Sequence, residues 1–416
     1  MSDAPPNFLD PKVQESPYEH YRWLRDEAPV YHDPYTNMVH VSRYEDVRRV
    51  LTDNESFCAY APLPDDAPTE HQRRIYHLFK QNGWVPALTL IARDDPNHRQ
   101  MRAIFNEAFR PSRIRAMDAF VQETAYRLLD AFVADGRCEW VRQFALPMPL
   151  TIIVQQMGAD LEDMWKIKRW TDAFFHRIGM MLSEEEEIET VEREIEAQHY
   201  FQRIFERLRL EPDDSLLSEL VNREIPEWGR PLNDNELHAE MMADTFVGGS
   251  ETTTNALSAG VKLLVENPSV WERLRDDPET NLRPFIEEVL RLESPVQCLT
   301  RRAAKDVELS GGKIAKGSVI AVRYGAANRD EREFPNPDDL DLDRKRPGSH
   351  LAFGSGAHHC LGAPLARREL WWGFRALLDR VESLAFAPGK NDFAHHPHFL
   401  LRALKELHIE FAPAAR

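Results

Sequence analysis

One of the four cysteines lies in the stretch whose residue types and spacing most clearly indicate a chemical site. Residues 353–362 read FGSGAHHCLG, with Cys360 near the end. The glycines let the backbone approach a flat group closely. A helical pattern begins near Ala363, so a thiolate at Cys360 would be stabilised by the positive end of a helix, and Gly362 leaves no side-chain bulk beside the sulfur. We therefore expect a functional thiolate; the alternative is a buried cysteine in a turn, as most lone cysteines are.

A long helical pattern in the middle of the chain carries a second group of candidates. It covers residues 234–266, which would span roughly 50 Å as a helix. An Asn-x-x-Glu capping signal precedes it and a proline follows it. Its centre is poor helix sequence, because Gly248 and Gly249 each cost about 1 kcal/mol relative to alanine and three threonines follow. Such a weak centre is typical of a functional position, or else of a close helix crossing that needs glycine.

Glu251 and Thr252 stand directly beside these glycines. A carboxylate and a hydroxyl on a locally opened helix are suited to carrying protons to a buried site. The alternative for Glu251 is a surface charge or a salt bridge.

The cysteine stretch resembles the haem-binding loop of cytochrome P450, whose pattern is Phe-Gly-x-Gly-x-His-x-Cys-x-Gly. Residues 248–252 (GGSET) resemble that family's Ala/Gly-Gly-x-Asp/Glu-Thr segment, and residues 288–291 (EVLR) resemble its Glu-x-x-Arg helix. The three motifs occur in the family's order and spacing, and the resemblance covers about residues 18–411. It implies a mainly α fold with small β-sheets, in which haem lies between the long central helix and the cysteine loop with its helix. The polar N-terminus and the size resemble the bacterial type.

The resemblance also implies roles for the residues of the first two motifs. Cys360 would be the proximal ligand of haem b, and its thiolate would favour cleavage of the O–O bond. Thr252 would hydrogen-bond the oxygen species and Glu251 would relay protons toward it. Gly248 and Gly249 would belong to the same cofactor-binding set.

Cationic partners are required for the haem propionates. At positions that match the family pattern, His98, Arg102, Arg301 and His358 would supply them. His98 and Arg102 are four residues apart, so one helix face can present both. The alternative for each is an ordinary surface charge, and Arg302 stands next to Arg301.

Three further residues would support the cysteine loop. Phe353 would pack near the thiolate and tune it. Glu288 and Arg291 are three residues apart on a helix and can form an ion pair that clamps the segment before the cysteine. The family often has an arginine after Phe-x-x-Pro, where this chain has two aspartates, so either Arg344 or Arg329 could complete the clamp.

A hydrophobic small molecule, such as a terpenoid, a steroid, a fatty acid or an aromatic compound, is the substrate class that the resemblance implies. Small-molecule sites are mostly apolar with a few polar groups. Family position predicts the following pocket residues: Trp84, Leu88, Phe174, Asp244, Val247, Val296, Gln297 and Phe399.

Two other functions compete with a monooxygenase. Zinc is one, since His358 and His359 precede Cys360 and more histidines occur in 395–398, but neighbouring residues rarely close one tetrahedral site and neither CxxC nor HExxH occurs. The other is a peroxygenase or a non-oxygenating haem protein of the same fold. The acid–alcohol pair of the central helix favours dioxygen and two sequential electrons.

Electrons must come from another chain, because no Gly-x-Gly-x-x-Gly fingerprint of a nucleotide-binding domain follows a strand. By family analogy they come from NAD(P)H through a ferredoxin reductase and a small acidic ferredoxin. We expect the ferredoxin to dock near Cys360, where Arg367 and Arg368 could supply positive charge. The alternative is that both arginines are ordinary solvated helix residues.

Composition and charge indicate a cytoplasmic enzyme. The formal net charge is −17 and the sequence pI is near 5.5, which argues against nucleic-acid or anionic-membrane binding. The cysteines are scattered, as in a reducing compartment. We find neither a signal peptide nor an apolar run of about 18 residues, and we expect a monomer.

The chain has no internal repeat, so we expect an N-terminal arm (1–17) and a single catalytic domain (18–416). Helices are predicted near residues 16–28, 96–108, 112–134, 161–180, 184–209, 234–266, 269–276, 280–292 and 363–381. Strands are predicted at 39–41, in a hairpin of 306–309 and 318–322 around Gly311-Gly312, and at 407–411. The proline-rich segment 61–93 is predicted to be irregular, and loops of this length often form lids or binding loops. The acidic run Glu184–Glu187 is predicted to open a solvated helix.

Overall fold

The computed structural model describes residues 6–59 and 68–414 of the chain. These residues are mainly helical, with small β-sheets, and the chain divides into two compact units. We call residues 1–57, 117–149 and 251–416 the sheet unit, and residues 58–116 and 150–250 the helix unit. None of the described helices combines the length and the apolar composition needed to cross a membrane.

A five-stranded sheet in the order β1-β2-β8-β5-β3 organises one end of the sheet unit. Its strands are β1 (Val30–His32), β2 (Val39–Val41), β3 (Phe57–Cys58), β5 (Cys298–Ala303) and β8 (Val319–Arg323). β2 runs parallel to β8, and β5 runs antiparallel to β8. The predicted strand at 39–41 is therefore confirmed.

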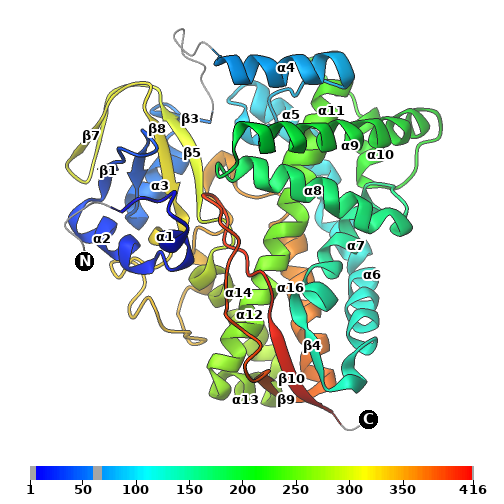
Figure 1. Ribbon diagram of the computed structural model, residues 1–416, viewed down its shortest axis with the longest axis vertical. Coiled ribbons are helices and arrows are strands. Elements are labelled where there is room, and N and C mark those ends of the chain that lie inside the picture. Colours follow the sequence, from blue (N-terminus) through cyan, green and yellow to red (C-terminus); the bar gives the residue numbers. More distant parts are fainter. Residues whose placement is uncertain (1–5, 60–67, 415–416) are drawn as a thin grey trace. The chain divides into compact units, whose positions relative to one another are not determined.

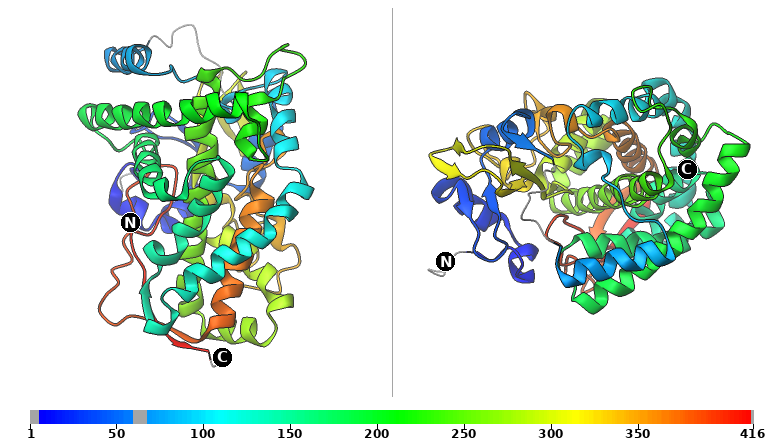
Figure 2. Two further views of the ribbon diagram at one scale, coloured as in Figure 1. Left: turned by 90° about the vertical axis from the view of Figure 1, so that its right-hand side faces the viewer. Right: turned by 90° about the horizontal axis from the view of Figure 1, so that it is seen from above.

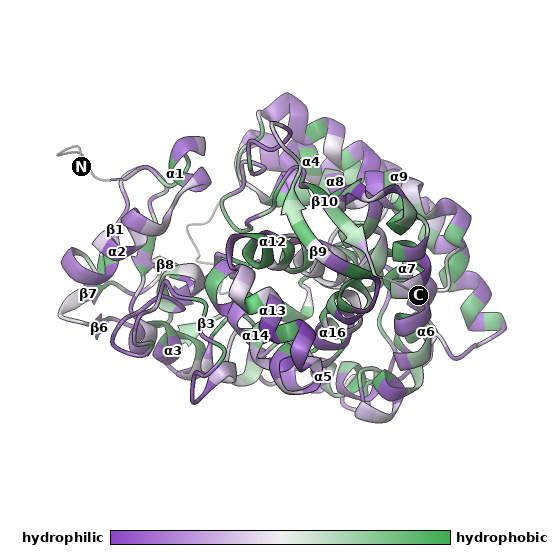
Figure 3. Cartoon of the chain, turned by 90° about the horizontal axis from the view of Figure 1, so that it is seen from below, coloured by the Kyte–Doolittle hydropathy of each residue, from purple (hydrophilic) through white to green (hydrophobic). Residues whose placement is uncertain are grey.

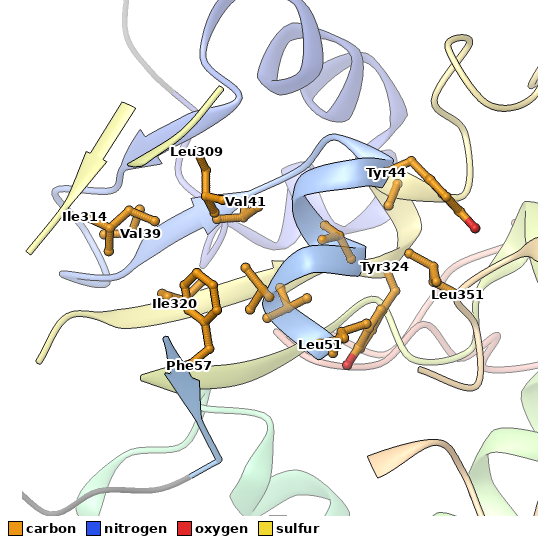
Figure 4. Packing of buried hydrophobic residues seen from close by; sticks show 14 of the residues in the cluster. Val39, Val41, Tyr44, Leu51, Phe57, Leu309, Ile314, Ile320, Tyr324 and Leu351 are labelled. Carbon is orange, nitrogen blue, oxygen red and sulfur yellow. The ribbon is translucent and has the colours of Figure 1, made fainter. Parts of the chain in front are cut away.

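Apolar side chains from this sheet pack against α3 (Tyr44–Thr52). Val39 and Ile320 contribute from the sheet, Leu51 contributes from the helix, and all three are almost fully buried. Figure 4 shows these side chains gathered between β2, β8 and α3. This core holds the C-terminal end of α3 in place.

The predicted hairpin around Gly311-Gly312 exists, but its second strand was assigned wrongly. β6 (Val307–Leu309) pairs with β7 (Gly312–Ile314), whereas 319–323 forms β8 of the larger sheet. The turn glycine Gly311 has φ +77°, which explains why glycine is needed there. β5, which pairs with β8, was not predicted.

A second sheet pairs β4 (Arg137–Glu139), β10 (His408–Pro413) and β9 (Val381–Phe386). Figure 3 shows β9 and β10 side by side. β10 confirms the predicted closing strand, while β9 was missed.

The sheet unit contains further α-helices besides α3. They are α1 (Pro11–Glu15), α2 (Tyr18–Glu27), α12 (Thr252–Glu266), α13 (Pro268–Asp276), α14 (Pro278–Glu293), α15 (Tyr324–Ala327) and α16 (Ala363–Arg380). α12, α14 and α16 pack on one another. The approach of α12 and α16 requires glycine, because a Cβ on Gly260 would lie 2.3 Å from Cζ of Phe374 and a Cβ on Gly373 would lie 2.7 Å from Cδ2 of Leu257.

The helix unit consists of packed helices without a large sheet. They are α4 (Glu70–Asn82), α5 (Asn97–Ala108), α8 (Met164–Ile178), α9 (Glu184–Leu210), α10 (Leu216–Asn222) and α11 (Asp234–Glu240), while α6 (Pro111–Asp130) and α7 (Pro147–Gln156) contain residues of both units. α8 packs along α9 (Figure 1), and so does α4 (Figure 2). The acidic run does open α9, with Ser183 as its cap.

The segment 61–93 was predicted to be irregular, but it contains a helix. Residues 61–67 lie outside the described part of the chain, but α4 begins behind a Thr69–Gln72 capping box. Phe79 of α4 is buried against Val191 and Ile195 of α9. The prediction failed because the prolines on either side of α4 outweighed its short apolar stripe.

The predicted helix 234–266 is present, and its weak centre has a distinct geometry. α11 leads into a π-helical stretch, Met241–Glu251, and α12 begins at Thr252. Asn233 and Glu236 form the predicted capping box. The glycines and the predicted acid–alcohol pair thus fall in the widened stretch or at its end, and such π-helical segments are frequent at functional sites.

Candidate active site

The cysteine loop of the sheet unit is ordered by its own backbone and by α3. The N–H of Cys360 donates to the carbonyl of Phe353 at 2.9 Å. Gly354 and Gly356 have φ values of +68° and +69°, which favour glycine. At Gly356 a side chain is also excluded sterically, because a Cβ would lie 2.5 Å from the carbonyl oxygen of Leu51 at the end of α3.

The thiol of Cys360 is accessible. Among the other cysteines, Cys138 and Cys298 are buried and Cys58 is half-buried, whereas Cys360 is exposed. This is unusual for cysteine, which is among the most buried residue types. α16 begins three residues later at Ala363, as predicted, so the sulfur lies near the positive end of a long helix. The alternative of a buried turn cysteine is therefore wrong.

The predicted clamp before the cysteine loop is a buried network of three residues. Nε of Arg291 lies 2.6 Å from Oε1 of Glu288, and both side chains are fully buried. Nε of Arg344 lies 3.0 Å from the same oxygen. Arg329 pairs instead with Asp338 at 2.8 Å, so Arg344 is the third member of the clamp.

A second ionic cluster, which the sequence analysis missed, joins α14 to α16. Nε and Nη2 of Arg367 donate to the two carboxylate oxygens of Glu287 at 2.6 and 2.9 Å, and Nε2 of His350 lies 2.9 Å from Oε2. Burial opposes ionisation of Glu287, but the hydrogen bonds from Arg367 and His350 outweigh it and hold its pKa at about 2. Arg367 also lies 4.5 Å from the ring centroid of Phe353, so this cluster supports the cysteine loop.

These contacts change the interpretation of the two arginines of α16. Arg367 is committed to Glu287, and Arg368 pairs with Asp118 at 2.6 Å and stacks over Trp372. Each guanidinium therefore has a carboxylate partner within the sheet unit, and the use of these arginines by a ferredoxin stays a prediction.

The predicted acid–alcohol pair lies at the start of α12. Glu251 is buried and Thr252 is half-buried. The next residue, Thr253, hydrogen-bonds the side chain of Glu369 from α16, which is buried and has no ionic partner there. Burial raises the pKa of Glu369 to about 8, so this group is a neutral carboxylic acid at pH 7. Glu369 was not predicted, although its position on an otherwise apolar face of α16 was a usable signal.

Arg301 and His358 also belong to the sheet unit. Arg301 is buried on β5 and donates to the carbonyl of Thr300 at 2.8 Å. Arg302 is less buried and lies 3.4 Å from the carbonyl oxygen of Gly317. His358 ends a short 3-10 turn, Gly356–His358, two residues before the cysteine.

In the helix unit, His98 and Arg102 both lie on α5. His98 is buried, with Nδ1 3.7 Å from Oδ1 of Asp95. Burial and the positive charge of Arg102 lower the pKa of His98.

Gly248 and Gly249 lie in the π-helical stretch. Gly248 is exposed and Gly249 is half-buried. A Cβ on Gly249 would make only an ordinary contact of 3.4 Å with Cδ1 of Ile153. A tight helix crossing therefore does not account for Gly249.

The predicted pocket residues of the helix unit have different surroundings. Leu88 is 45% exposed, Phe174 is half-buried and Val247 is buried. Trp84 packs on His238 with ring centroids 4.5 Å apart and ring planes tilted by 41°.

Asp244, also predicted for the pocket, is half-buried and accepts a hydrogen bond from the N–H of Ile91 at 3.3 Å. The carboxylate of Asp244 thus already has a hydrogen-bond donor within the helix unit.

Two predicted pocket residues of the sheet unit are buried and contact other residues of that unit. Gln297 accepts from the hydroxyl of Tyr21 at 2.9 Å and donates to two main-chain carbonyls, so its amide is fully used. Phe399 is 2% exposed and stacks on the guanidinium of Arg323 at 4.4 Å. Val296 is half-buried.

The chemistry of these groups fits haem and not zinc. Within residues 6–59 and 68–414, no group of three or more His, Cys, Asp or Glu side chains is arranged to hold a metal ion. Haem needs only one protein thiolate, because its macrocycle supplies the other ligands. An accessible Cys360 before a helix, in a loop whose glycines admit a flat group, meets that requirement.

Comparison with known proteins agrees with this chemistry. Residues 7–405 match the model of the cytochrome P450 family. The polyketide biosynthesis cytochrome P450 PksS of Bacillus subtilis is 33% identical over 374 residues, covering 89% of this chain and 88% of that protein. The steroid C26-monooxygenase of Mycobacterium tuberculosis is 30% identical over 394 residues, covering 95% and 93%. The structure of CYP109E1 from Bacillus megaterium in complex with testosterone has a TM-score of 0.80 at 31% identity and covers 95% of this chain and 99% of that one.

The chain belongs to the cytochrome P450 family, and it is a haem-thiolate monooxygenase, an oxidoreductase.

Proposed function

We propose that this P450 uses dioxygen and two externally supplied electrons to hydroxylate, or otherwise oxidise, a hydrophobic small molecule. The observation that carries the proposal is the accessible thiol of Cys360, held in a glycine-shaped loop directly before α16. Terpenoids, steroids, fatty acids and aromatic compounds form the substrate class. Steroids are the first to test, because one relative is named as a steroid monooxygenase and another was solved with testosterone.

Bound haem b supplies the redox chemistry that activates dioxygen. Cys360 would bind it as the thiolate, with the clamp and the Glu287 cluster holding the loop. Four side chains would bind the propionates: His98, Arg102, Arg301 and His358. Charge-assisted hydrogen bonds of this kind are short and strong.

Glu251 and Thr252 would move protons at the distal side. The buried carboxyl of Glu251 would take a proton from solvent, and the hydroxyl of Thr252 would hand it on while keeping its own hydrogen-bond geometry. Their place at the end of a π-helical stretch supports this role, because widened turns leave main-chain carbonyls for water and hydroxyl groups.

The electrons would come from NAD(P)H through a ferredoxin reductase and a ferredoxin. Because Arg367 and Arg368 are engaged in ion pairs, the ferredoxin would have to compete with Glu287 and Asp118 if it used them.

The carbon-monoxide difference spectrum of the reduced protein tests the assignment of Cys360. The native protein is expected to give the absorption band that is characteristic of thiolate ligation, and Cys360→His is expected to lose it while still binding haem. Cys58→Ser is the matched control and should keep the band. A thiolate band that persists in Cys360→His would overturn the proposal.

A further inference from the structure

Two carboxyl groups of the helix unit hold one short segment of backbone. Glu240, at the end of α11, is 1% exposed, and its Oε1 accepts the N–H of Leu90 at 2.6 Å. Asp244 follows four residues later, and its Oδ2 accepts the N–H of Ile91 at 3.3 Å. Residues four apart lie on one helix face, so adjacent carboxyls bind adjacent amides.

Oε2 of Glu240 is buried and has no hydrogen-bond partner among the described residues, and the carboxyl group of Asp244 acts on that of Glu240. Two neighbouring carboxylates have no hydrogen to share, so a hydrogen bond between them needs a proton on one of them. The cation that acts on Glu240 is Arg93, but its Nη2 lies 3.3 Å from Oε1 of Glu236. Glu236 in turn binds Arg230 at 2.7 Å. A proton shared by Glu240 and Asp244 therefore reduces the repulsion between the two carboxyl groups more than a positive side chain does.

The titration of the pair agrees with this geometry. Burial raises the pKa of Glu240 well above its usual range, and the neighbouring charge of Asp244 raises it further. Burial also raises the pKa of Asp244. The pair consequently keeps one proton near neutral pH and loses it as the pH rises.

The tethered segment presents apolar side chains. Leu88 and Ile91 are 45% and 48% exposed, and they flank the amide of Leu90. Exposed apolar side chains on a segment that is fixed by a buried and a half-buried acid indicate a binding surface more than a packing element. Leu88 is also one of the residues that family position assigns to the substrate pocket.

We propose that Glu240 and Asp244 are positioning residues for substrate selection: they form a proton-sharing anchor that fixes residues 88–91 and thereby sets where Leu88 and Ile91 stand. The identification of these side chains as substrate contacts rests on the proposed function, whereas the anchor is a property of the chain itself.

The direction of the pH effect follows from the charges. With one proton shared, both amides keep an acceptor and the carboxyls attract each other. When that proton leaves, two buried carboxylates stand side by side and repel each other, which favours release of the segment into water. Anchoring is therefore strongest at low pH and weakens as the pH rises.

Hydrogen–deuterium exchange of the Leu90 amide in the haem-loaded protein measures the anchor directly. Protection, corrected for the intrinsic exchange rate, is expected to fall at least about tenfold from about pH 6 to about pH 9. The amide of Trp84 is the internal control, because its acceptor is the neutral Oε1 of Gln198 at 2.9 Å, and its protection should stay constant.

Variants of Glu240 complete the test. Glu240→Gln keeps an acceptor for Leu90 and gives Asp244 a permanent N–H donor, so protection should become independent of pH. Glu240→Ala removes the acceptor, and protection should be low at every pH. A wild-type profile that is flat, a Glu240→Gln profile as steep as the wild type, or full protection in Glu240→Ala would each overturn the anchor.

The link to substrate is tested with testosterone, followed by the low-to-high-spin shift of the haem. The Kd of the wild type is expected to rise at least about fivefold over the same pH range, while that of Glu240→Gln stays constant. Equal pH dependence in both proteins overturns the positioning role. If testosterone does not bind at any pH, the steroid class of the proposed function is contradicted. The hydrogen–deuterium exchange result then tests the anchor by itself.

Discussion

Buried carboxyl groups are stabilised in opposite ways in the two units. In the sheet unit, Glu287 and Glu288 on α14 face guanidinium groups at 2.6 Å, and these partners hold the pKa of each below its usual range despite burial. In the helix unit, Glu240 and Asp244 face main-chain amides and each other, and burial raises the pKa of both.

The difference teaches how each region responds to its surroundings. A buried charge persists only where several hydrogen bonds and an opposite charge replace water, and the carboxylates of such a network stay ionised near neutral pH. Such a network suits α14, which supports the loop of Cys360. A buried acid without a cation keeps its proton instead, so its contacts depend on pH. That property suits the segment 88–91, for which we propose a role with substrate.

The strongest way to break this comparison is to remove the cation at the centre of the clamp. Arg291→Ala leaves the fully buried Glu288 with the cation Arg344 and the main-chain N–H of Asp341, and it removes three donors to main-chain carbonyls. We expect a loss of about 3–5 kcal/mol in the free energy of unfolding, measured by urea denaturation. Arg283→Ala, at an exposed position of the same helix, should stay within about 0.5 kcal/mol of the wild type. A loss of less than about 1 kcal/mol in Arg291→Ala would contradict the clamp.

The clamp also illustrates what the sequence can predict. Glu288 and Arg291 are neighbours on one helix face, so their spacing alone was enough to expect the pair. The third member was left open between Arg344 and Arg329, because Arg344 reaches Glu288 across 56 residues of chain. Local periodicity holds no information about such a contact. The same limit explains why Glu240 and Asp244 could not be assigned to the amides of Leu90 and Ile91.

Secondary structure shows the same division. The strand at 39–41 and the long helices were predicted because each repeats its own pattern over its whole length. β5 and β9 were missed, and β8 was assigned to the wrong partner, because pairing is decided by strands far away in the chain. The candidate site motifs were found because each is local, whereas the hydrogen bond between Thr253 and Glu369 depends on the packing of α16 on α12.

Glu369 extends the comparison, because it is an unpaired buried acid inside the sheet unit. Its pKa of about 8 in the folded protein lies above that of an unfolded glutamate, so stability is full below about pH 4.5 and falls as the pH rises to about 8. Each pH unit of this difference corresponds to about 1.4 kcal/mol, and relaxation of the site should reduce the total to a few kcal/mol. Glu369→Gln should therefore be more stable than the wild type at pH 9, measured by thermal unfolding.

A matched variant with the opposite sign controls this result. Glu287 has a pKa of about 2, so its contribution is present above about pH 4.5 and is lost as the pH falls toward 2. Glu287→Gln should thus be less stable than the wild type at neutral pH. If both variants shift stability in the same direction at pH 9, the distinction between paired and unpaired acids is wrong.

The smallest expected effect separates the two candidate arginines. Arg344→Ala should cost about 1.5–3 kcal/mol, because it removes a charge-assisted hydrogen bond to Glu288. Arg329→Ala can have a similar cost through its own pair with Asp338. The single variants alone therefore do not distinguish them, and a double-mutant cycle with Glu288→Gln does. Arg344 should couple to Glu288 by about 1 kcal/mol or more, since they share a bond, whereas the effect of Arg329 should add within about 0.5 kcal/mol. If Arg329 couples to Glu288 as strongly as Arg344 does, or more strongly, then Arg329 is the third member of the clamp. The network behind the cysteine loop would in that case include Asp338.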